Sequence, residues 1–180
     1  MKKHLVEYEG MTFAESISAE EIQKEVVRVA EEINADYAGR EPLFVCVLNG
    51  AFMYASDLMK YITLPCEITF VRMKSYEGTE TTGKVKMLIP LQVDVKGRDV
   101  IVIEDIVDTG ITMHAFMNAL RAMGADSVPL TSFLYTPATL RYDGVKAQCY
   151  GLAIPPAFII GYGLDINEKA RNLASIYVKV

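Results

Sequence analysis

Short apolar runs alternate with amphipathic helical patterns along this chain. Ser18 and Glu21 form a capping box, and apolar residues then recur every three or four positions until Gly39, which predicts a helix. The run 43–48 (LFVCVL) is wholly apolar, as in a strand covered on both faces, and 51–62 returns to a helical pattern. The first half of the chain is therefore predicted to run helix, buried strand, helix.

The alternation continues in the second half. Residues 67–74 and 84–90 are predicted to be strands, and VIVI at 100–103 is a second strand buried on both faces. A helix follows, and then a strand over 127–135, placed nearer an edge because it contains Pro129. Strands alternating with helices predict an α/β fold with a mainly parallel twisted sheet flanked by helices. Its ligand is expected beyond the carboxyl ends of the strands, near a switch in strand order.

Composition narrows the class of protein. The 180 residues suit a single domain, 1–180, and 51% apolar residues favour a folded chain over a disordered one. A net charge of −5 argues against a general nucleic-acid binder, although a local pocket for a small anion remains compatible with it. No apolar run reaches the length of a membrane span and none follows the N-terminal lysines, so a cytoplasmic protein is expected.

Cysteine and histidine are scarce. Cys46, Cys66 and Cys149 are odd in number and widely spaced, which predicts reduced core thiols rather than metal ligands or a catalytic nucleophile. His4 and His114 are the only histidines, so the chain has few residues from which to build a zinc site or a Ser-His triad.

The stretch VIVIEDIVDTGIT (100–112) carries the candidate chemistry. Glu104 and Asp105 follow the buried run, where each carboxylate can accept a hydroxyl proton of a vicinal diol. The turn 108–112 leads into a helix whose first N–H groups, with the Thr109 and Thr112 hydroxyls, suit a phosphate. Hydroxyl acceptors beside phosphate donors indicate a sugar phosphate or nucleotide. The structural alternative is that the Asp of the turn merely caps the helix.

This stretch resembles the phosphoribosyl diphosphate (PRPP) motif of type I phosphoribosyltransferases. Three further segments narrow the resemblance to the 6-oxopurine branch, the hypoxanthine or hypoxanthine-guanine phosphoribosyltransferases. They are VLNGAFMYASDLM, MKSYEGTETTGKVK and FIIGYGLDINEKARNL, so the resemblance covers most of the chain from Leu43 onward. It implies the type I phosphoribosyltransferase fold, with a small hood from the termini to which 153–180 contributes. It also implies a flexible catalytic loop, the lid 75–84, headed by Ser75 and Tyr76.

The resemblance implies a reaction and its partners. A 5-phosphoribosyl group would move from PRPP to N9 of a 6-oxopurine base, hypoxanthine and also guanine, with Mg²⁺ required and pyrophosphate released. A homodimer or homotetramer is expected, with neither nucleic acid nor membrane as a partner. The alternatives are a transferase that prefers xanthine and a non-catalytic PRPP-fold regulator that senses nucleotides.

Site residues carry over position by position. Glu104 and Asp105 would hold the ribose hydroxyls and, together with Asp165, the magnesium ion. The segment from Asp108 to Thr112 would cradle the 5′-phosphate, and its members are Asp108, Thr109, Gly110, Ile111 and Thr112. Asp108 would also face purine N7 as general acid or base.

The remaining site residues flank that core. Asn49 and Gly50 would contact pyrophosphate through the backbone, and Arg171 would neutralise it. Phe158 would stack on the base and the Ile159 backbone would contact its edge. Taken singly, Phe158 could be ordinary core, Arg171 a solvated charge, and Asp165 a cap of the turn with Asn167.

Two positions depart from the family pattern. The family often has a lysine where this chain has Asn49, so only a backbone role is carried over there. It also places a lysine before Pro137 to donate to the purine 6-oxo group. The candidate positions here are Leu134, Tyr135 and Thr136, where a hydroxyl or a main-chain N–H is the expected substitute.

Overall fold

The computed structural model describes residues 4–75 and 85–180. Tyr76 and the rest of the predicted lid, 76–84, lie outside the described residues. Ser75 is the last residue of the strand that leads into that segment. No helix in the described part of the chain is long and apolar enough to cross a membrane.

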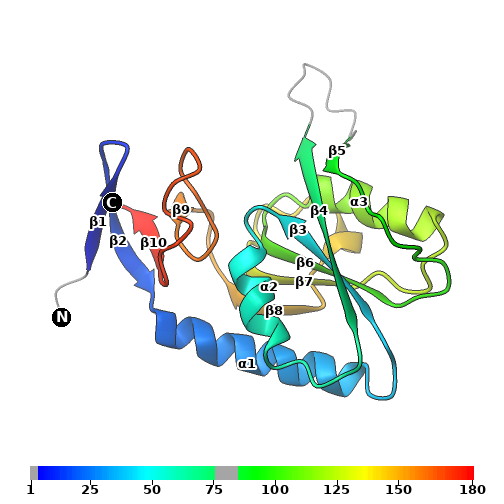
Figure 1. The fold of residues 1–180 in the computed structure, drawn as a ribbon. Helices are drawn as coiled ribbons and strands as arrows, with labels where there is room; N and C mark the ends of the chain where they lie inside the picture. The colour runs from blue at the N-terminus through cyan, green and yellow to red at the C-terminus, as the bar shows by residue number, and fades with distance from the viewer. Residues whose placement is uncertain (1–3, 76–84) are drawn as a thin grey trace.

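A six-stranded sheet forms the body of the molecule, in the order β5-β4-β3-β6-β7-β8 (Figure 1). Four of its five pairings are parallel, and only β4 and β5 pair antiparallel. The predicted α/β fold with a mainly parallel sheet is therefore confirmed. The strands are β3 (Leu43–Leu48), β4 (Glu67–Ser75), β5 (Val85–Ile89), β6 (Val100–Val107), β7 (Leu130–Tyr135) and β8 (Cys149–Ala153).

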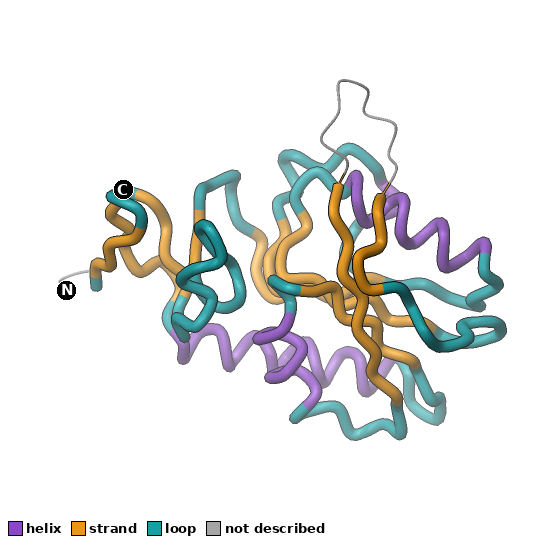
Figure 2. Tube along the Cα trace, turned by 45° about the horizontal axis from the view of Figure 1, so that its top comes forward, coloured by secondary structure: helices purple, strands orange, loops and turns teal. Residues whose placement is uncertain are grey.

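Helices cover both faces of this sheet (Figure 2). α1 (Ala19–Asp36) and α2 (Phe52–Met59) pack on one face, in a core cluster with Phe44, Cys46 and Phe133. α3 (Ile111–Ala122) packs on the other face against the alternate residues of the same strands. Alternating side chains along β3 and β6 thus enter two different cores, which is why those runs are apolar at nearly every position. A short 3₁₀ turn, η1 (Asp143–Val145), lies beside α3.

A second, smaller sheet brings the two ends of the chain together. It has the order β1-β2-β10-β9, all antiparallel, and it stands beside the start of α1 (Figure 1). Its strands are β1 (Leu5–Tyr8), β2 (Met11–Ile17), β9 (Ile159–Ile160) and β10 (Ile176–Lys179). The family resemblance implied such a hood, but the sequence patterns predicted none of its four strands.

Asp57 ties this hood to the large sheet's helices. Its carboxylate accepts hydrogen bonds from the Tyr162 hydroxyl at 2.9 Å, from Gln23 of α1 at 2.7 Å and from Lys60 at 2.6 Å. Burial raises the pKa of Asp57, but these three hydrogen bonds outweigh burial and the pKa is lowered overall. The C-terminal segment is therefore anchored to α1 and α2 through one carboxylate.

Three boundaries differ from the sequence predictions. α2 ends at Met59 rather than at 62, and β7 begins at Leu130, just after Pro129. β6 does not end with VIVI at 103 but continues to Val107, because β7 pairs with it through the acidic residues and beyond. The prediction that Glu104 and Asp105 follow the strand was therefore wrong, since both lie within it.

The cysteines match their prediction as free thiols in or near the core. Cys46 and Cys149 are buried and Cys66 is half-buried, and none forms a disulfide. Burial, aided by nearby negative charge, raises the pKa of Cys46 to about 12 and that of Cys149 to about 11. Such thiols remain protonated near neutral pH, which argues against a nucleophilic role.

Candidate active site

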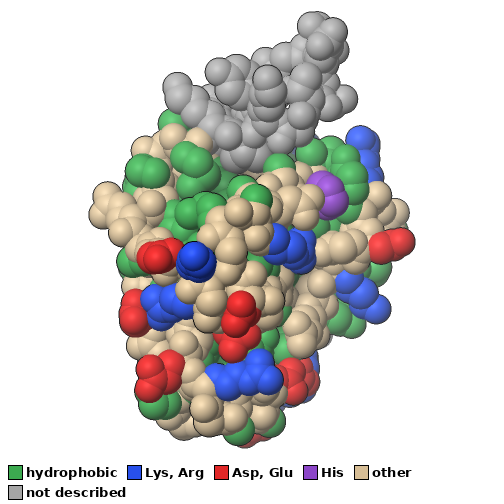
Figure 3. Space-filling view, turned by 90° about the vertical axis from the view of Figure 1, so that its right-hand side faces the viewer, with side chains coloured by type: hydrophobic (Ala, Val, Ile, Leu, Met, Phe, Trp, Pro, Cys, Tyr) green, Lys and Arg blue, Asp and Glu red, His purple; other side chains and the backbone are tan. Residues whose placement is uncertain are grey.

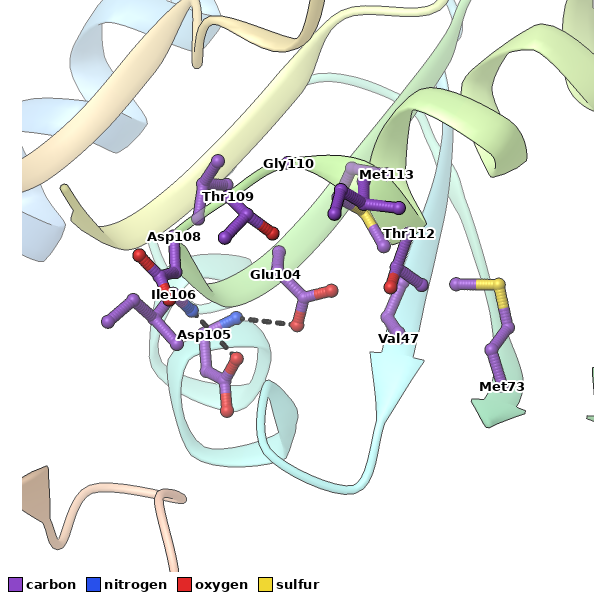
Figure 4. A pocket seen from close by; sticks show the side chains of 12 residues that line it. Val47, Met73, Glu104, Asp105, Ile106, Asp108, Thr109, Gly110, Thr112 and Met113 are labelled. Atoms are coloured by element: carbon purple, nitrogen blue, oxygen red, sulfur yellow. Dashed lines mark hydrogen bonds between the residues drawn. The ribbon is translucent and has the colours of Figure 1, made fainter. Parts of the chain in front are cut away.

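The order of the strands opens a gap at the carboxyl edge of the sheet. β3 pairs with β6 only as far as Cys46 and Ile103, and it then separates from β6, staying paired with β4 as far as Leu48 while β6 runs on beside β7. The gap holds a pocket of about 270 Å³ at the predicted switch in strand order (Figure 4). Its lining comprises Val47, Met73, Glu104, Asp105, Ile106, Val107, Asp108, Thr109, Gly110, Ile111, Thr112 and Met113.

Glu104 and Asp105 sit on the open edge of β6. Beyond Ile103 no strand on the β3 side continues the ladder, and the carboxylates fill part of that role. The Asp105 N–H donates to Glu104 Oε1 at 3.1 Å, and the Ile106 N–H donates to Asp105 Oδ1 at 2.7 Å (Figure 4). The two side chains are thereby held close together at the pocket, rather than pointing to solvent.

Holding two carboxylates together has an electrostatic cost. Burial raises the pKa of Glu104 well above its ordinary value, and the neighbouring charge of Asp105 raises it further. Burial also raises the pKa of Asp105, although hydrogen bonds and the positive charge of Arg171 act in the opposite direction. The pair therefore takes up a proton more readily than isolated carboxylates.

Gly50 allows the 49–50 turn to pass directly over Asp105. A Cβ at Gly50 would lie 1.6 Å from Asp105 Oδ2, so no other residue fits without displacing the carboxylate. The sequence predicted that Asn49 and Gly50 border the site, and the structure brings this turn against one of the predicted acids. The turn therefore contacts Asp105, although neither Asn49 nor Gly50 is among the residues that line the pocket.

The loop before α3 is shaped like an anion site. Gly110 is the N-cap, with a φ of 74°, and no side chain caps the helix. The helix ladder starts with a bond from the His114 N–H to the Gly110 carbonyl. N–H groups of a first helical turn have no carbonyl partner within the helix and favour anions. The alternative that Asp108 is simply the helix cap is wrong.

A segment far along the chain lies over this loop. A Cβ on Gly110 would come within 2.4 Å of Val145 and 3.0 Å of Leu140. The Thr139 hydroxyl donates a hydrogen bond to Asp108 Oδ1 and lies 3.1 Å from the Thr136 carbonyl oxygen. The sequence patterns missed Thr139, because it is 31 positions from Asp108 and carries no motif of its own.

Arg171 is held by several acceptors of its own segment. Its guanidinium donates to the Gly163 carbonyl at 2.7 Å and to the Glu168 carboxylate at 2.8 Å, and it pairs with Asp165 at 2.8 Å. Its side chain is 19% exposed, so the alternative of a freely solvated charge is wrong. Asp165 also accepts the Glu168 N–H at 2.8 Å, so it does cap the turn, as its structural alternative proposed.

The Glu168 carboxylate contacts side chains that could otherwise bind an anion. Besides Arg171, the Asn49 side chain hydrogen-bonds its carboxylate and Arg72 approaches it to 3.9 Å. These contacts, with Arg171 first, lower the pKa of Glu168. The Asn49 side chain therefore contributes to the same cluster as Arg171, although the family pattern suggested only a backbone role.

Ile159 is the first residue of β9, and Phe158 directly precedes it. Phe158 is 47% exposed with its ring 5.7 Å from Phe13, so the alternative of an ordinary core residue is wrong. The Lys179 N–H donates to the Phe158 carbonyl, which makes that pair a hydrogen-bonded one. Hydrogen-bonded and free pairs alternate in an antiparallel ladder, so the Ile159 N–H and C=O point out of it.

The three candidate positions for the 6-oxo donor are all buried. Leu134 is part of the core beside α1 and α2, and the Tyr135 ring packs 5.1 Å from Tyr150 in the core beside α3. Thr136 is 1% exposed, and its N–H already donates to the Val107 carbonyl. The structure therefore does not bring these side chains into the pocket formed by the acids and the phosphate loop.

The carboxylates suit a hard cation that is completed by substrate oxygens. Among the described residues no group of three or more His, Cys, Asp and Glu side chains is arranged to hold a metal on its own. Mg²⁺ usually takes one or two carboxylates and completes its shell with phosphate and water. The mutual repulsion of Glu104 and Asp105, seen in their raised pKa values, would be relieved by a nearby cation. The donor set therefore fits Mg²⁺.

Comparison with known proteins gives one consistent answer. Residues 14–167 match the model of the phosphoribosyl transferase domain. A hypoxanthine-guanine phosphoribosyltransferase of Bacillus subtilis is 39% identical over 163 residues, which are 90% of each chain. A hypoxanthine-guanine-xanthine phosphoribosyltransferase of Tritrichomonas foetus is 32% identical over 157 residues, 87% of this chain and 86% of that one.

A solved structure shares the same fold. The crystal structure of a hypoxanthine-guanine phosphoribosyltransferase from Bacillus anthracis superposes with a TM-score of 0.86 at 37% identity. The match covers 92% of this chain and 96% of that one.

The acidic pair yields a prediction about stability without metal or substrate. Because the folded-state pKa of Glu104 is raised, the folded protein loses stability as pH rises from the unfolded value, about 4.3, through the folded pKa. Glu104→Gln removes that loss and should raise the free energy of unfolding by about 1 to 3 kcal/mol near neutral pH, with little change at about pH 4. Urea denaturation in a chelating buffer at both pH values measures this.

The exposed Glu31 of α1 provides the control. Glu31→Gln should change stability little at either pH. A Glu104→Gln protein less stable than wild type near neutral pH would contradict the electrostatic account of the pair.

Proposed function

The chain belongs to the phosphoribosyltransferase family, in its hypoxanthine-guanine branch, and we propose that it transfers 5-phosphoribosyl from PRPP to N9 of hypoxanthine and guanine. The products are a nucleoside 5′-monophosphate and pyrophosphate, which makes this a purine salvage reaction. The observation that carries the proposal is the β6–α3 connection, where two carboxylates and a helix start line one pocket.

The pocket divides into a phosphate half and a hydroxyl half. The 5′-phosphate of PRPP is assigned to the first turn of α3 and the loop 109–112, where backbone N–H groups suit a dianion. The ribose hydroxyls are assigned to Glu104 and Asp105, which accept charge-assisted hydrogen bonds. Asp108 lies between the two halves and is assigned to purine N7. The sugar passes through a cationic state, so positioned carboxylates stabilise it and orient the base.

Pyrophosphate is assigned to the 49–50 turn and to Arg171. Arg171 forms ion pairs with Asp165 and Glu168. When pyrophosphate binds, its oxygens would replace one of these carboxylates as the partner of the guanidinium. Mg²⁺, when bound, would offset the negative charge of pyrophosphate. Asp165, Glu104 and Asp105 do not form one metal-binding group, so one or two of these carboxylates would hold the ion and substrate oxygens would complete its shell. Ser75 ends β4 two positions after Met73, a pocket residue, so the predicted lid begins next to the site.

The base is assigned to the hood. The exposed Phe158 ring offers a stacking surface, and the outward N–H and C=O of Ile159 offer a donor and an acceptor for the purine edge. Hypoxanthine and guanine are proposed on the strength of the named relatives. Xanthine is the second candidate, because one relative of similar length is named for all three bases and the expected lysine is absent here.

A nucleic-acid-binding regulator is less well supported. Figure 3 shows the face on the right of Figure 1, where Lys and Arg side chains are interspersed with Asp and Glu. No basic stripe is visible on that face, and the net charge of the chain is −5. Free cysteines support a reducing compartment, and we place the protein in the cytoplasm, away from membranes.

An uncovered apolar surface on β4 supports assembly of two or more copies. Ile68 and Phe70 pair with Phe44 and Cys46 of β3, so they point to the face that α1 and α2 cover. They are nevertheless 38% and 44% exposed. Large apolar side chains in neighbouring exposed positions are typical of an interface, and a second copy of this chain is the proposed partner.

The reaction is tested with a panel of bases. With PRPP and Mg²⁺, pyrophosphate release is expected for hypoxanthine and guanine, and none for adenine or uracil. Release with xanthine alone would favour the second candidate. Silence with every base would contradict the proposed enzyme and favour the regulator.

Asp108→Asn tests the assignment of the carboxylate to purine N7. Turnover with hypoxanthine should fall by about 10²-fold or more, while PRPP affinity changes by less than about twofold, because the phosphate and hydroxyl sites remain. Steady-state kinetics and calorimetric titration of PRPP measure the two quantities. Equal losses in both would indicate that Asp108 only shapes the turn.

Phe70→Glu tests the interface. A charge placed in an apolar contact should abolish assembly, so the solution mass from light scattering should fall to that of one chain. Met123→Glu, at an exposed apolar position directly after α3, should leave the mass of the assembly unchanged. A wild-type protein that is already a monomer would contradict the proposal.

A further inference from the structure

We propose that Thr139 is a positioning residue for Asp108, holding one oxygen of its carboxylate so that the other remains available to purine N7. This inference rests on the proposed function, in which Asp108 faces the base.

Asp108 needs support from a neighbour. It is exposed, and in the described part of the chain no lysine, arginine or histidine lies within 4.0 Å of its carboxylate. The terminal torsion of an aspartate is broad, so an exposed carboxylate without a partner rotates over a wide range. Its hydrogen-bond partner is the Thr139 hydroxyl, which donates to Oδ1.

Thr139 is itself firmly placed. Its N–H donates to the Thr136 carbonyl at 3.2 Å, which closes a turn at the end of β7. Two positions on, the Arg141 N–H donates to the Thr109 carbonyl at 3.1 Å. The turn is thereby bonded to β7 on one side and to the phosphate loop on the other.

Packing adds to these hydrogen bonds. Leu140 and Val145 lie so close to Gly110 that a Cβ there would collide with both. The segment around Thr139 therefore packs directly on the loop that carries Asp108, and this packing helps to hold the Thr139 hydroxyl near the carboxylate.

The Thr139 hydroxyl can donate only one hydrogen bond, and this limit suits a carboxylate that exchanges a proton. Thr139 has one hydroxyl hydrogen and two acceptors in reach, Asp108 Oδ1 and the Thr136 carbonyl oxygen at 3.1 Å. The charged carboxylate is the stronger acceptor, so the hydrogen goes to Oδ1. Oδ2 is then left to take the N7 proton as N9 bonds to C1′ and pyrophosphate leaves with the electron pair of the broken C1′–O bond.

The turn at Thr136 to Thr139 follows the segment where the family pattern puts a lysine, and in this chain it supplies a neutral hydroxyl to the Asp108 carboxylate. Orientation of Asp108 thus depends on a neutral hydrogen bond.

The test compares two substitutions at one position. Thr139→Val keeps the shape but removes the hydroxyl, and kcat should fall by about tenfold while KM for PRPP changes by less than about twofold. Thr139→Ser keeps the hydroxyl and should restore most of kcat. Thr63→Val, the same change at an exposed turn remote from the pocket, should leave kcat unchanged. Thermal unfolding of all three shows whether the fold is retained.

A double-mutant cycle separates positioning from a general structural role. In an Asp108→Ala background Thr139→Val should have no further effect on kcat, because the carboxylate on which it acts is gone. A fall by the same factor in both backgrounds, or failure of serine to rescue, would overturn the inference.

A structural readout stays informative whatever the activity. In crystal structures the Asp108 carboxylate should adopt one orientation in wild type and Thr139→Ser, and several in Thr139→Val. A wild-type crystal structure in which Thr139 does not contact Asp108 would overturn the inference by itself. Absence of wild-type turnover on the base panel would instead overturn the proposed function.

Discussion

The site depends on one feature of the sheet, the early departure of β3 from its partner β6. Pairing between them ends at Cys46 and Ile103, whereas β6 continues beside β7 to Val107. The unpaired edge of β6 then has N–H groups to satisfy, and the Asp105 N–H donates to the Glu104 carboxylate there, while the Ile106 N–H donates to the Asp105 carboxylate. Carboxylates at the open edge of a strand are unfavourable in a hydrophobic core, but they can accept hydrogen bonds from the hydroxyls of a sugar.

The other parts of the site are arranged around that edge. Gly50 lets the departing chain cross over Asp105, and α3 begins where β6 ends, so its N-terminus faces the same pocket. Arg171 reaches Asp105 electrostatically from the hood, and Asp57 fastens the hood to α1 and α2. Repulsion within the acidic pair is a stability cost that a PRPP-magnesium complex would relieve, and sites built for charged ligands commonly carry such a cost.

Local patterns in the sequence predicted five of the six strands of the large sheet, all but β8, and placed the candidate acids and phosphate loop on one segment. β3 and β6 were evident as apolar runs, and the acids and the threonine-glycine turn followed in fixed order on one segment. The end of β6 was misplaced because strand propensity is low for Glu104 and Asp105, and pairing with β7 overrides it. β2 was missed since it pairs with β10, more than 150 positions away, which no local pattern contains. β1 pairs only with β2, across the tight turn at Glu9 and Gly10, and that local hairpin was not predicted either. Thr139 was missed for the same reason, as its role arises only when two turns meet.

A crystal structure with a bound nucleoside 5′-monophosphate tests the central claim most directly. The account predicts the phosphate on the N–H groups of 109–112, the two ribose hydroxyls on Glu104 and Asp105, and purine N7 facing Asp108. A phosphate bound at Arg171, with the ribose away from the end of β6, would contradict it.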